Sequence, residues 1–144
     1  MSLFEAHHNG FTISTDPARL DISIIFDYLN GRSYWAAGRP RDVLEKALKH
    51  SLNFGVYGAD GAQIGFARII SDYATFAYLC DVFVLEAQQG AGLGKWLIEC
   101  VRAHPDLQHL RRWMLATRDA HGLYRQYGFA ELADPSKWME SFQP

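Results

Sequence analysis

The sequence predicts a mixed α/β fold: a mostly antiparallel sheet with one parallel pair of strands at its centre, flanked by helices. Three observations support this prediction. An Asp-Gly step at residues 60–61, between two strand-like runs, is typical of an antiparallel hairpin. A nearly continuous apolar run at 76–85 leads through a glycine-rich turn into an amphipathic helix, and another strand follows at 113–117. A strand–helix–strand crossover joins parallel neighbours, so the sheet must be mixed.

The first half of the chain supplies two helices before the hairpin. Thr15-Asp16-Pro17 offers an N-cap followed by proline at the first helical position, and helical spacing then continues until Asn30-Gly31. Pro40 opens a second helix that reaches Leu48, and a loop at 32–39 separates the two helices. The strands expected in this half are residues 11–14, 54–57 and 64–70.

The second half begins with the apolar strand and its helix, which Pro105 ends. After the strand at 113–117, Asp119 is expected to cap a short helix with Gly128 at its C′ position. A last strand is expected at residues 129–132.

Composition narrows the class of protein. With 144 residues, of which 49% are hydrophobic and 21% charged, the chain can bury one core, so we expect a single domain over residues 1–144. A net charge of −2 and a pI near 6.3 provide no basic field for nucleic acid. No apolar run approaches the roughly 20 residues of a membrane span. Cys80 and Cys100 lie in apolar stretches without Cys-x-x-Cys spacing, so we expect reduced thiols and a cytoplasmic protein.

The turn at residues 89–94 predicts an anion site, because glycines between a strand and a helix N-terminus let backbone N–H groups converge. A phosphate group is the ligand that such a site is expected to bind. A Walker loop would need glycine at Gln89 and serine or threonine at Trp96, and a Rossmann fingerprint would need glycine at Lys95. Neither motif fits. A plain flexible turn before a helix is the alternative interpretation.

The pattern Gln89-x-x-Gly92-x-Gly94 resembles the coenzyme A pyrophosphate motif of the GNAT acetyltransferase superfamily, Gln/Arg-x-x-Gly-x-Gly/Ala. The resemblance extends back through 81–85 and forward to 115–117 and 120–129, about the C-terminal half of the chain. It implies a GNAT-like fold and acetyl-coenzyme A as co-substrate. The residues expected to hold the coenzyme on this turn are Gln89, Gly90, Ala91, Gly92, Leu93, Gly94 and Lys95.

The resemblance also implies how the transfer works. An amine attacks the acetyl carbonyl directly, and backbone N–H groups of Phe83 and Val84 bind the acetyl oxygen and the pantetheine arm. Tyr124 matches the family tyrosine that protonates the leaving thiolate; its alternative is a packing role. Thr117 stands where many members have an asparagine that contacts the pantetheine or the acceptor.

The base that accepts the amine's proton is expected to be Asp81, since a carboxylate in an apolar strand is costly without a purpose. The alternative is a structural ion pair with Arg68. Glu86 and His121 are further candidates for this base. None of the six histidines forms a ligand pair at i, i+4, so no catalytic metal is expected.

The acceptor is expected to be a small-molecule amine. The resemblance makes the loop at 32–39 one wall of its site, where Tyr34 and Trp35 could hold an ammonium, and Asp72 and Tyr73 are expected on the opposite side. Trp35 folded over the core as a lid is the alternative. Also left open are a coenzyme A-binding sensor without transfer activity, a longer acyl group, and a homodimer.

Overall fold

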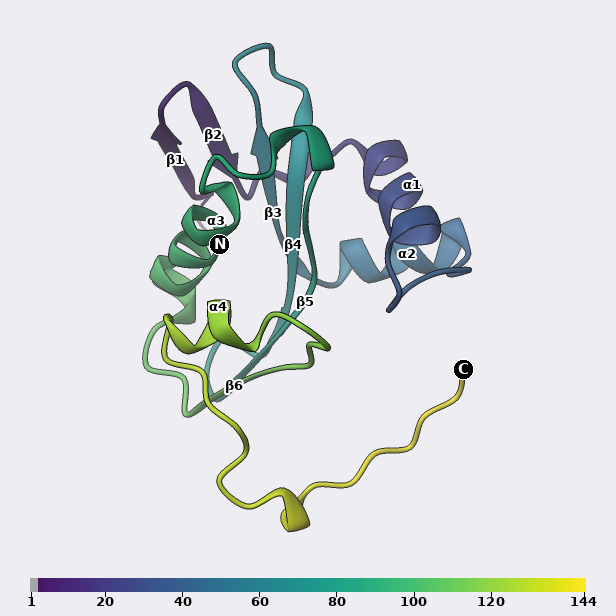
Figure 1. Cartoon of the computed structure of the whole chain (residues 1–144), viewed down its shortest axis with the longest axis vertical. Helices are drawn as coiled ribbons and strands as arrows, with labels where there is room; N and C mark the ends of the chain where they lie inside the picture. Colours follow the sequence, from purple (N-terminus) through teal and green to yellow (C-terminus); the bar gives the residue numbers. More distant parts are fainter. Residues whose placement is uncertain (1–2) are drawn as a thin grey trace.

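A computed structural model describes residues 3–144 and contains one sheet of six strands in the order β1-β2-β3-β4-β5-β6 (Figure 1). Every neighbouring pair is antiparallel except β5 and β6, which are parallel. The strands are β1 Glu5–His8, β2 Phe11–Ser14, β3 Leu52–Tyr57, β4 Gln63–Ser71, β5 Phe76–Val84 and β6 Arg112–Leu115. The predicted mixed α/β class is confirmed.

The parallel pair lies at one edge of the sheet, which corrects the expectation of a central position. The reason is that the strand expected at residues 129–132 does not form, so nothing in the described chain pairs with the outer side of β6. At the other edge, β1 was not predicted. Asn9 and Gly10, both with positive φ (51° and 81°), form the turn of its hairpin with β2, and this Asn-Gly step was the available signal.

The first helical segment begins later than predicted. Asp16 caps only the 3-10 turn η1 Pro17–Arg19, after which Leu20 is extended. Helix α1 Ile22–Arg32 begins where the Asp21 carboxylate accepts from the N–H of Ile24 at 3.1 Å. The N–H of Asp21 donates to Gln63 Oε1 at 2.7 Å, a contact 42 residues away in the chain that sequence periodicity does not reveal. The helix also continues through Gly31.

The remaining elements in the middle of the chain follow the prediction closely. Helix α2 Arg41–Lys49 begins after Pro40, and the Asp-Gly hairpin joins β3 to β4. Helix α3 Leu93–Ala103 follows the short turn η2 Glu86–Gln88 and leads into η3 Pro105–Leu107.

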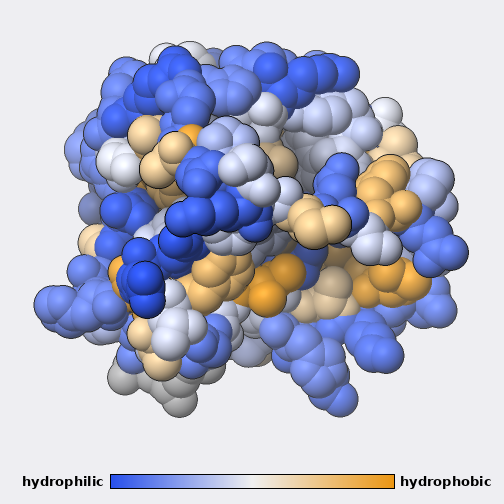
Figure 2. Space-filling model, turned by 90° about the horizontal axis from the view of Figure 1, so that it is seen from below, coloured by the Kyte–Doolittle hydropathy of each residue, from blue (hydrophilic) through white to orange (hydrophobic). Residues whose placement is uncertain are grey.

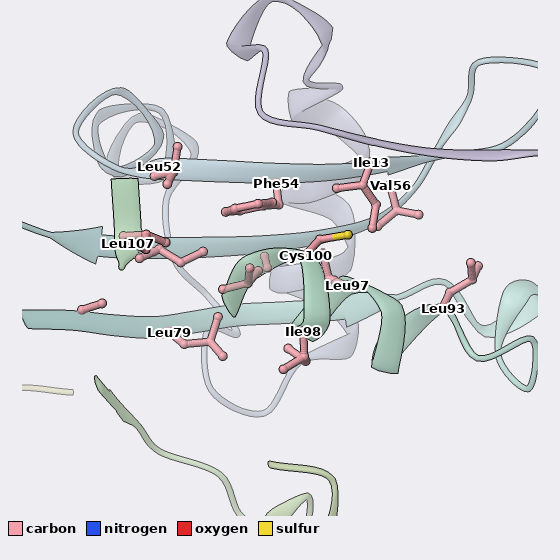
Figure 3. Packing of buried hydrophobic residues seen from close by; sticks show 14 of the residues in the cluster. Ile13, Leu52, Phe54, Val56, Leu79, Leu93, Leu97, Ile98, Cys100 and Leu107 are labelled. Atoms are coloured by element: carbon pink, nitrogen blue, oxygen red, sulfur yellow. The ribbon is translucent and has the colours of Figure 1, made fainter. Parts of the chain in front are cut away.

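Helices cover both faces of the sheet, with α3 on one side and α1 and α2 on the other (Figure 1). On the α3 side, Figure 3 shows Phe54, Val56 and Leu79 of the strands packed against Leu97 and Ile98 of the helix. On the opposite side Phe66 and Phe83 pack with residues of α1 and α2. This two-sided packing fixes β5, the strand on which the site is built.

Helix α4 His121–Arg125 is short, and its N-cap is Ala120, so the predicted cap by Asp119 is wrong and no side chain caps the helix. The hydroxyl of Thr117 accepts from the N–H of Ala120 just before the helix begins. Gly128 ends it as predicted, with φ 91° and bonds from the N–H groups of Gly128 and Phe129 to the carbonyls of Arg125 and Tyr124. The chain then passes through η4 Pro135–Lys137 into an extended tail. No helix in residues 3–144 is long and apolar enough to cross a membrane.

Candidate active site

The two parallel strands part in the middle of β5. Their register runs from Phe76 opposite Arg112 to Leu79 opposite Leu115, where β6 ends. Strand β5 continues to Val84 with β4 on one side only. The second half of β5 therefore presents backbone to an open space beside the end of β6.

A β-bulge lies on β5 where the strands part. The register with β4 shifts between Phe66, opposite Phe83, and Arg68, opposite Cys80, so β5 carries an extra residue. Asp81 in this stretch has φ 53°, a left-handed conformation that is uncommon for a residue with a side chain. The bulge persists because the carboxylate of Asp81 is fixed by its surroundings.

Three side chains hold that carboxylate. Arg68 Nε lies 2.8 Å and Arg39 Nη1 2.9 Å from Oδ2, and Trp35 Nε1 lies 2.9 Å from Oδ1. Asp81 is buried, with 3% of its surface exposed. Burial alone would raise its pKa, but hydrogen bonds and positive charge from Arg39 and Arg68 outweigh burial and lower the pKa below its usual value.

These contacts are those of an ion pair with Arg68, the alternative that the sequence left open, extended by Arg39 and Trp35. A carboxylate with a lowered pKa accepts a proton poorly near neutral pH. The geometry favours the structural role, and the role of Asp81 as general base stays a prediction. The two further candidates for the general base, Glu86 and His121, are both exposed.

The N–H of Leu85 donates to the carbonyl of Ile64 on β4 at 2.8 Å. Because successive residues of a strand direct their backbone to alternate sides, Phe83 also faces β4, and Val84 faces the open side. Of the two expected donors, the register therefore favours Val84. The Phe83 side chain is buried and stacks on Tyr28, with ring centroids 4.1 Å apart.

The glycine turn has the shape that an anion site needs. Gly90 and Gly92 have φ of 93° and 77°, and Gly92 is the N-cap of α3. A Cβ added at Gly90, Gly92 or Gly94 would meet nothing within 4 Å, so the space outside the backbone is open. The first backbone N–H groups of α3 have no partner within the helix and point outward. The turn therefore offers open space in front of the α3 N-terminus, and its role as a pyrophosphate site stays a prediction.

Two side chains of the turn serve the fold. Gln89 Nε2 donates to the carbonyl of Val84 at 3.0 Å, which ties the turn to the end of β5. Leu93 is buried in the core, so only its backbone is available to a ligand. Ala91 and Lys95 are exposed.

A cleft of about 400 Å³ lies where the strands part. Tyr124 of α4 lines it and is 8% exposed. Burial, with a smaller effect of nearby Tyr34, raises the pKa of Tyr124 to about 12, so the phenol keeps its proton at neutral pH. The cleft residues are Tyr34, Trp35, Tyr78, Leu79, Cys80, Asp81, Val82, Leu115, Ala116, Thr117, Arg118, Asp119, Ala120 and Tyr124.

Tyr34 and Trp35, expected to contact the acceptor, form one wall of this cleft. Tyr34 Oη accepts from the N–H of Arg118 at 2.9 Å, and the Arg118 guanidinium carbon lies 3.8 Å from the centre of the Tyr34 ring. The loop between α1 and α2 is thus fastened to the segment after β6. Neither Arg39 nor Arg118 was predicted, because nothing in their local sequence distinguishes them from surface arginines.

Asp72 and Tyr73 do not line this cleft, which corrects their expected position opposite Tyr34 and Trp35. The Asp72 carboxylate accepts from the N–H groups of Ala74, Thr75 and Phe76 and from the Thr75 hydroxyl, and these bonds lower its pKa. It stabilises its own turn. Tyr73 packs against the core. In residues 3–144, no three His, Cys, Asp or Glu side chains are grouped to hold a metal ion.

Residues 50–131 match the model of the acetyltransferase (GNAT) domain. A curated relative from Gibberella zeae, described as an acetyltransferase, is 35% identical over 133 residues, covering 79% of this chain and 75% of the relative. The chain is therefore an acyltransferase. It belongs to the GNAT acetyltransferases, enzymes that use acetyl-coenzyme A.

Solved structures agree with this family. A crystal structure from Xanthomonas campestris pv. campestris, assigned to GNAT family acetyltransferases, is 49% identical with a TM-score of 0.92 and covers 96% of each chain. Spermidine N-acetyltransferase from Vibrio cholerae, in complex with coenzyme A and spermine, is 22% identical with a TM-score of 0.68 over 88% of this chain and 84% of that one. The second likeness shows the fold.

Proposed function

We propose that this chain transfers the acetyl group of acetyl-coenzyme A to the primary amine of a small molecule, by direct attack in a ternary complex with Tyr124 as general acid. One observation carries the proposal. The buried phenol of Tyr124 and the free half of β5 line the same cleft, at the place where β5 and β6 part. A proton donor and a row of unpaired backbone groups are what acyl transfer between bound partners requires.

The coenzyme would lie along β5 with its pyrophosphate on the glycine turn. We assign the pyrophosphate to the backbone of residues 89–95, where open space faces the N-terminus of α3. The N–H of Val84 is the donor available to the pantetheine arm, and Phe83 remains the weaker candidate of the pair. Thr117 lines the cleft, although its hydroxyl already accepts from Ala120.

In the reaction the amine nitrogen forms a bond to the acetyl carbon while the bond between that carbon and sulfur breaks. Tyr124 gives its proton to the departing sulfur and regains one afterwards. Its pKa of about 12 keeps the phenol protonated until that moment, although it also makes the phenol a weaker acid. The proton of the attacking ammonium passes to a base, for which Asp81 is the sequence prediction and a water chain the alternative.

The acceptor would enter beside the loop that carries Tyr34 and Trp35. Both side chains are partly exposed, and an aromatic face suits an ammonium. The Arg118 guanidinium covers one face of Tyr34, 3.8 Å from the ring centre, so Trp35 is the more accessible of the two. The Vibrio relative, which acts on spermidine, gives a precedent for an amine acceptor within the same fold.

A screen of the purified chain with acetyl-coenzyme A against polyamines, amino acids, aminoglycosides and peptide N-termini tests the proposal, with thiol release as the readout. We expect release with at least one small amine and a strong loss of it in Tyr124→Phe. Binding of coenzyme A without thiol release on any amine would support the sensor instead.

Three smaller expectations belong to the same proposal. We propose that residues 1–144 form one domain, which is supported by a single sheet built from both halves of the chain. A cytoplasmic location is supported by the two free cysteines, Cys80 and Cys100. A small amine is proposed as the partner in place of nucleic acid or membrane.

A further inference from the structure

The buried carboxylate of the cleft is already neutralised. Asp81 belongs to the lining, but its Oδ2 is bound by the guanidinium groups of Arg39 and Arg68. Its Oδ1 is bound by the indole of Trp35. Two positive charges therefore face one negative charge, and the positive surplus lies directly behind the lining of the cleft. An ammonium group that enters here meets a carboxylate whose charge is already compensated.

Arg118 adds a further positive charge to the cleft. It lines the cleft and is exposed, and within residues 3–144 its guanidinium forms no ion pair. The guanidinium carbon lies 3.8 Å from the ring centre of Tyr34, whose hydroxyl accepts from the Arg118 backbone N–H at 2.9 Å. Tyr34 thus fixes Arg118 at both its backbone and its side chain. Because stacking uses the flat face of the guanidinium, the N–H donors at its edge stay available to a ligand.

The charges around the cleft favour an acceptor that carries an anionic group. In the described part of the chain, the lining has one other charged residue, Asp119, which is exposed. With Arg39 and Arg68 behind Asp81, three guanidinium groups face two carboxylates. This surplus opposes a polyamine, which carries several positive charges. The edge of a guanidinium binds a carboxylate or a phosphate through two parallel hydrogen bonds.

Arg118 lies at the acceptor end of the cleft. The lining includes Tyr124 but none of residues 89–95, to which the pyrophosphate of the coenzyme is assigned. The volume of about 400 Å³ is that of a site for small molecules. Strand β6 and helix α4 lie in the lower half of the molecule (Figure 1), and the surface seen from below combines apolar patches with strongly hydrophilic residues (Figure 2). Such a surface suits a ligand with an apolar stem and a charged end.

We propose that Arg118 determines acceptor specificity by binding an anionic group of the acceptor, so that the preferred substrates are small amines with a carboxylate or a phosphate. An amino acid is the simplest molecule of this class. The guanidinium holds the anionic end while the amine end reaches toward Tyr124. This inference rests on the proposed function, because it concerns the acceptor of the same acetyl transfer.

Matched pairs of amines test the preference, with thiol release from acetyl-coenzyme A as the readout. The pairs are alanine and ethylamine, γ-aminobutyrate and propylamine, and phosphoethanolamine and ethanolamine; spermidine represents the polyamines. In at least one pair, kcat/KM should be about 10- to 100-fold higher for the anionic member, the range expected for hydrogen bonds between charged groups. Spermidine should fall below that member. The first two pairs and the third distinguish a carboxylate from a phosphate.

Variants of Arg118 test whether this residue causes the preference. Arg118→Gln removes the charge and keeps the backbone N–H bond to Tyr34, so we expect it to fold. It should lower kcat/KM for the anionic amine about 10- to 100-fold and for its partner amine less than ~3-fold. Arg118→Lys, which keeps the charge without the planar fork, should retain part of the preference. Arg111→Gln is the matched control, since Arg111 is exposed and does not line the cleft, and it should change neither value.

Calorimetric binding of the same amines to the chain saturated with coenzyme A separates this inference from the transfer reaction. If no amine releases thiol, the proposed function fails, while tighter binding of the anionic amine that is lost in Arg118→Gln still supports the inference. Equal kcat/KM and equal binding within every pair, a preference for spermidine, or a preference that survives in Arg118→Gln would each overturn it. Weaker coenzyme A binding in Arg118→Gln with an unchanged preference would overturn it too and assign Arg118 to the coenzyme.

Discussion

The indole Nε1 of Trp35 donates a hydrogen bond of 2.9 Å to Oδ1 of Asp81, 46 residues further along the chain. This bond joins the loop between α1 and α2 to the bulge on β5. With Arg39 and Arg68 it holds Asp81 in a left-handed conformation. The loop proposed to contact the acceptor thus also stabilises the strand proposed to hold the coenzyme.

The double variant Tyr34→Ala/Trp35→Ala tests the acceptor wall. Loss of two aromatic faces should raise the acceptor KM about 2- to 30-fold, the range expected for cation–π attraction of 0.5–2 kcal/mol. The KM of acetyl-coenzyme A should change much less than the KM of the acceptor, because the glycine turn is untouched and Arg39 and Arg68 still hold Asp81 on β5. Steady-state kinetics at saturating coenzyme measure both. A variant that melts at a lower temperature but keeps wild-type kinetics would show that Tyr34 and Trp35 only pack and do not bind the acceptor.

Tyr124→Phe tests the proton donor. The change removes one hydroxyl from a buried ring, so kcat should fall roughly 10- to 1000-fold while the coenzyme KM changes little. Since burial raises the pKa of this phenol to about 12, its ionisation should cause no loss of wild-type rate below about pH 11.

Tyr127→Phe is the matched control on the neighbouring turn, where the hydroxyl of Tyr127 lies 3.1 Å from Glu99. It should keep the wild-type kcat. Equal turnover in Tyr124→Phe and the wild type across the pH range would return Tyr124 to a packing role.

Gly92→Asp tests the glycine turn. A carboxylate there would occupy the space in front of the α3 N-terminus and repel the pyrophosphate, so acetyl-coenzyme A should bind at least ~100-fold more weakly, about 2.7 kcal/mol. Calorimetric titration of the folded variant measures the loss. Gly61→Asp is the control, because Gly61 has a similar φ of 84° in the distant β3–β4 turn and so suffers the same backbone strain. Wild-type affinity in Gly92→Asp would refute the site.

Asp81→Asn separates an ion pair from a general base. Breaking a buried ion pair leaves Arg39 and Arg68 facing an uncharged amide, at a cost of about 3–5 kcal/mol at pH 7. Because the folded pKa of Asp81 is lowered, its contribution is fully present above the unfolded pKa of about 3.9 and disappears as pH falls through the folded pKa. Denaturant unfolding at pH 7 and pH 3 should show the gap between wild type and variant narrowing at pH 3.

The same variant has a kinetic readout. A general base at Asp81 predicts that the acidic limb of the kcat/KM profile vanishes in the folded variant, whereas the ion pair, which we favour, predicts an intact limb. Asp27→Asn, an exposed carboxylate on α1, is the control and should change neither stability nor profile. Loss of the limb with unaltered stability would make Asp81 the base.

The sequence alone determined the mixed sheet, the parallel pair, the glycine turn and the family. Those features rest on local patterns: an Asp-Gly step, an apolar strand, glycines before an amphipathic helix, and Tyr124 four residues before Gly128. Each of these patterns lies within a short stretch of the sequence, because turn geometry and helical periodicity are local properties of the backbone.

Only the tertiary structure decided which groups surround Asp81, where Asp72 lies, and which edge of the sheet stays open. Arg39 and Trp35 reach Asp81 from more than 40 residues away, and Gln63 sets the start of α1 across the same distance. Residues 129–132 were expected to return as a strand, yet no ladder forms, because a strand exists only where another chain segment supplies its hydrogen bonds. Contacts and strand pairs between distant residues form only when the folded chain brings those residues together, so local sequence patterns do not reveal them.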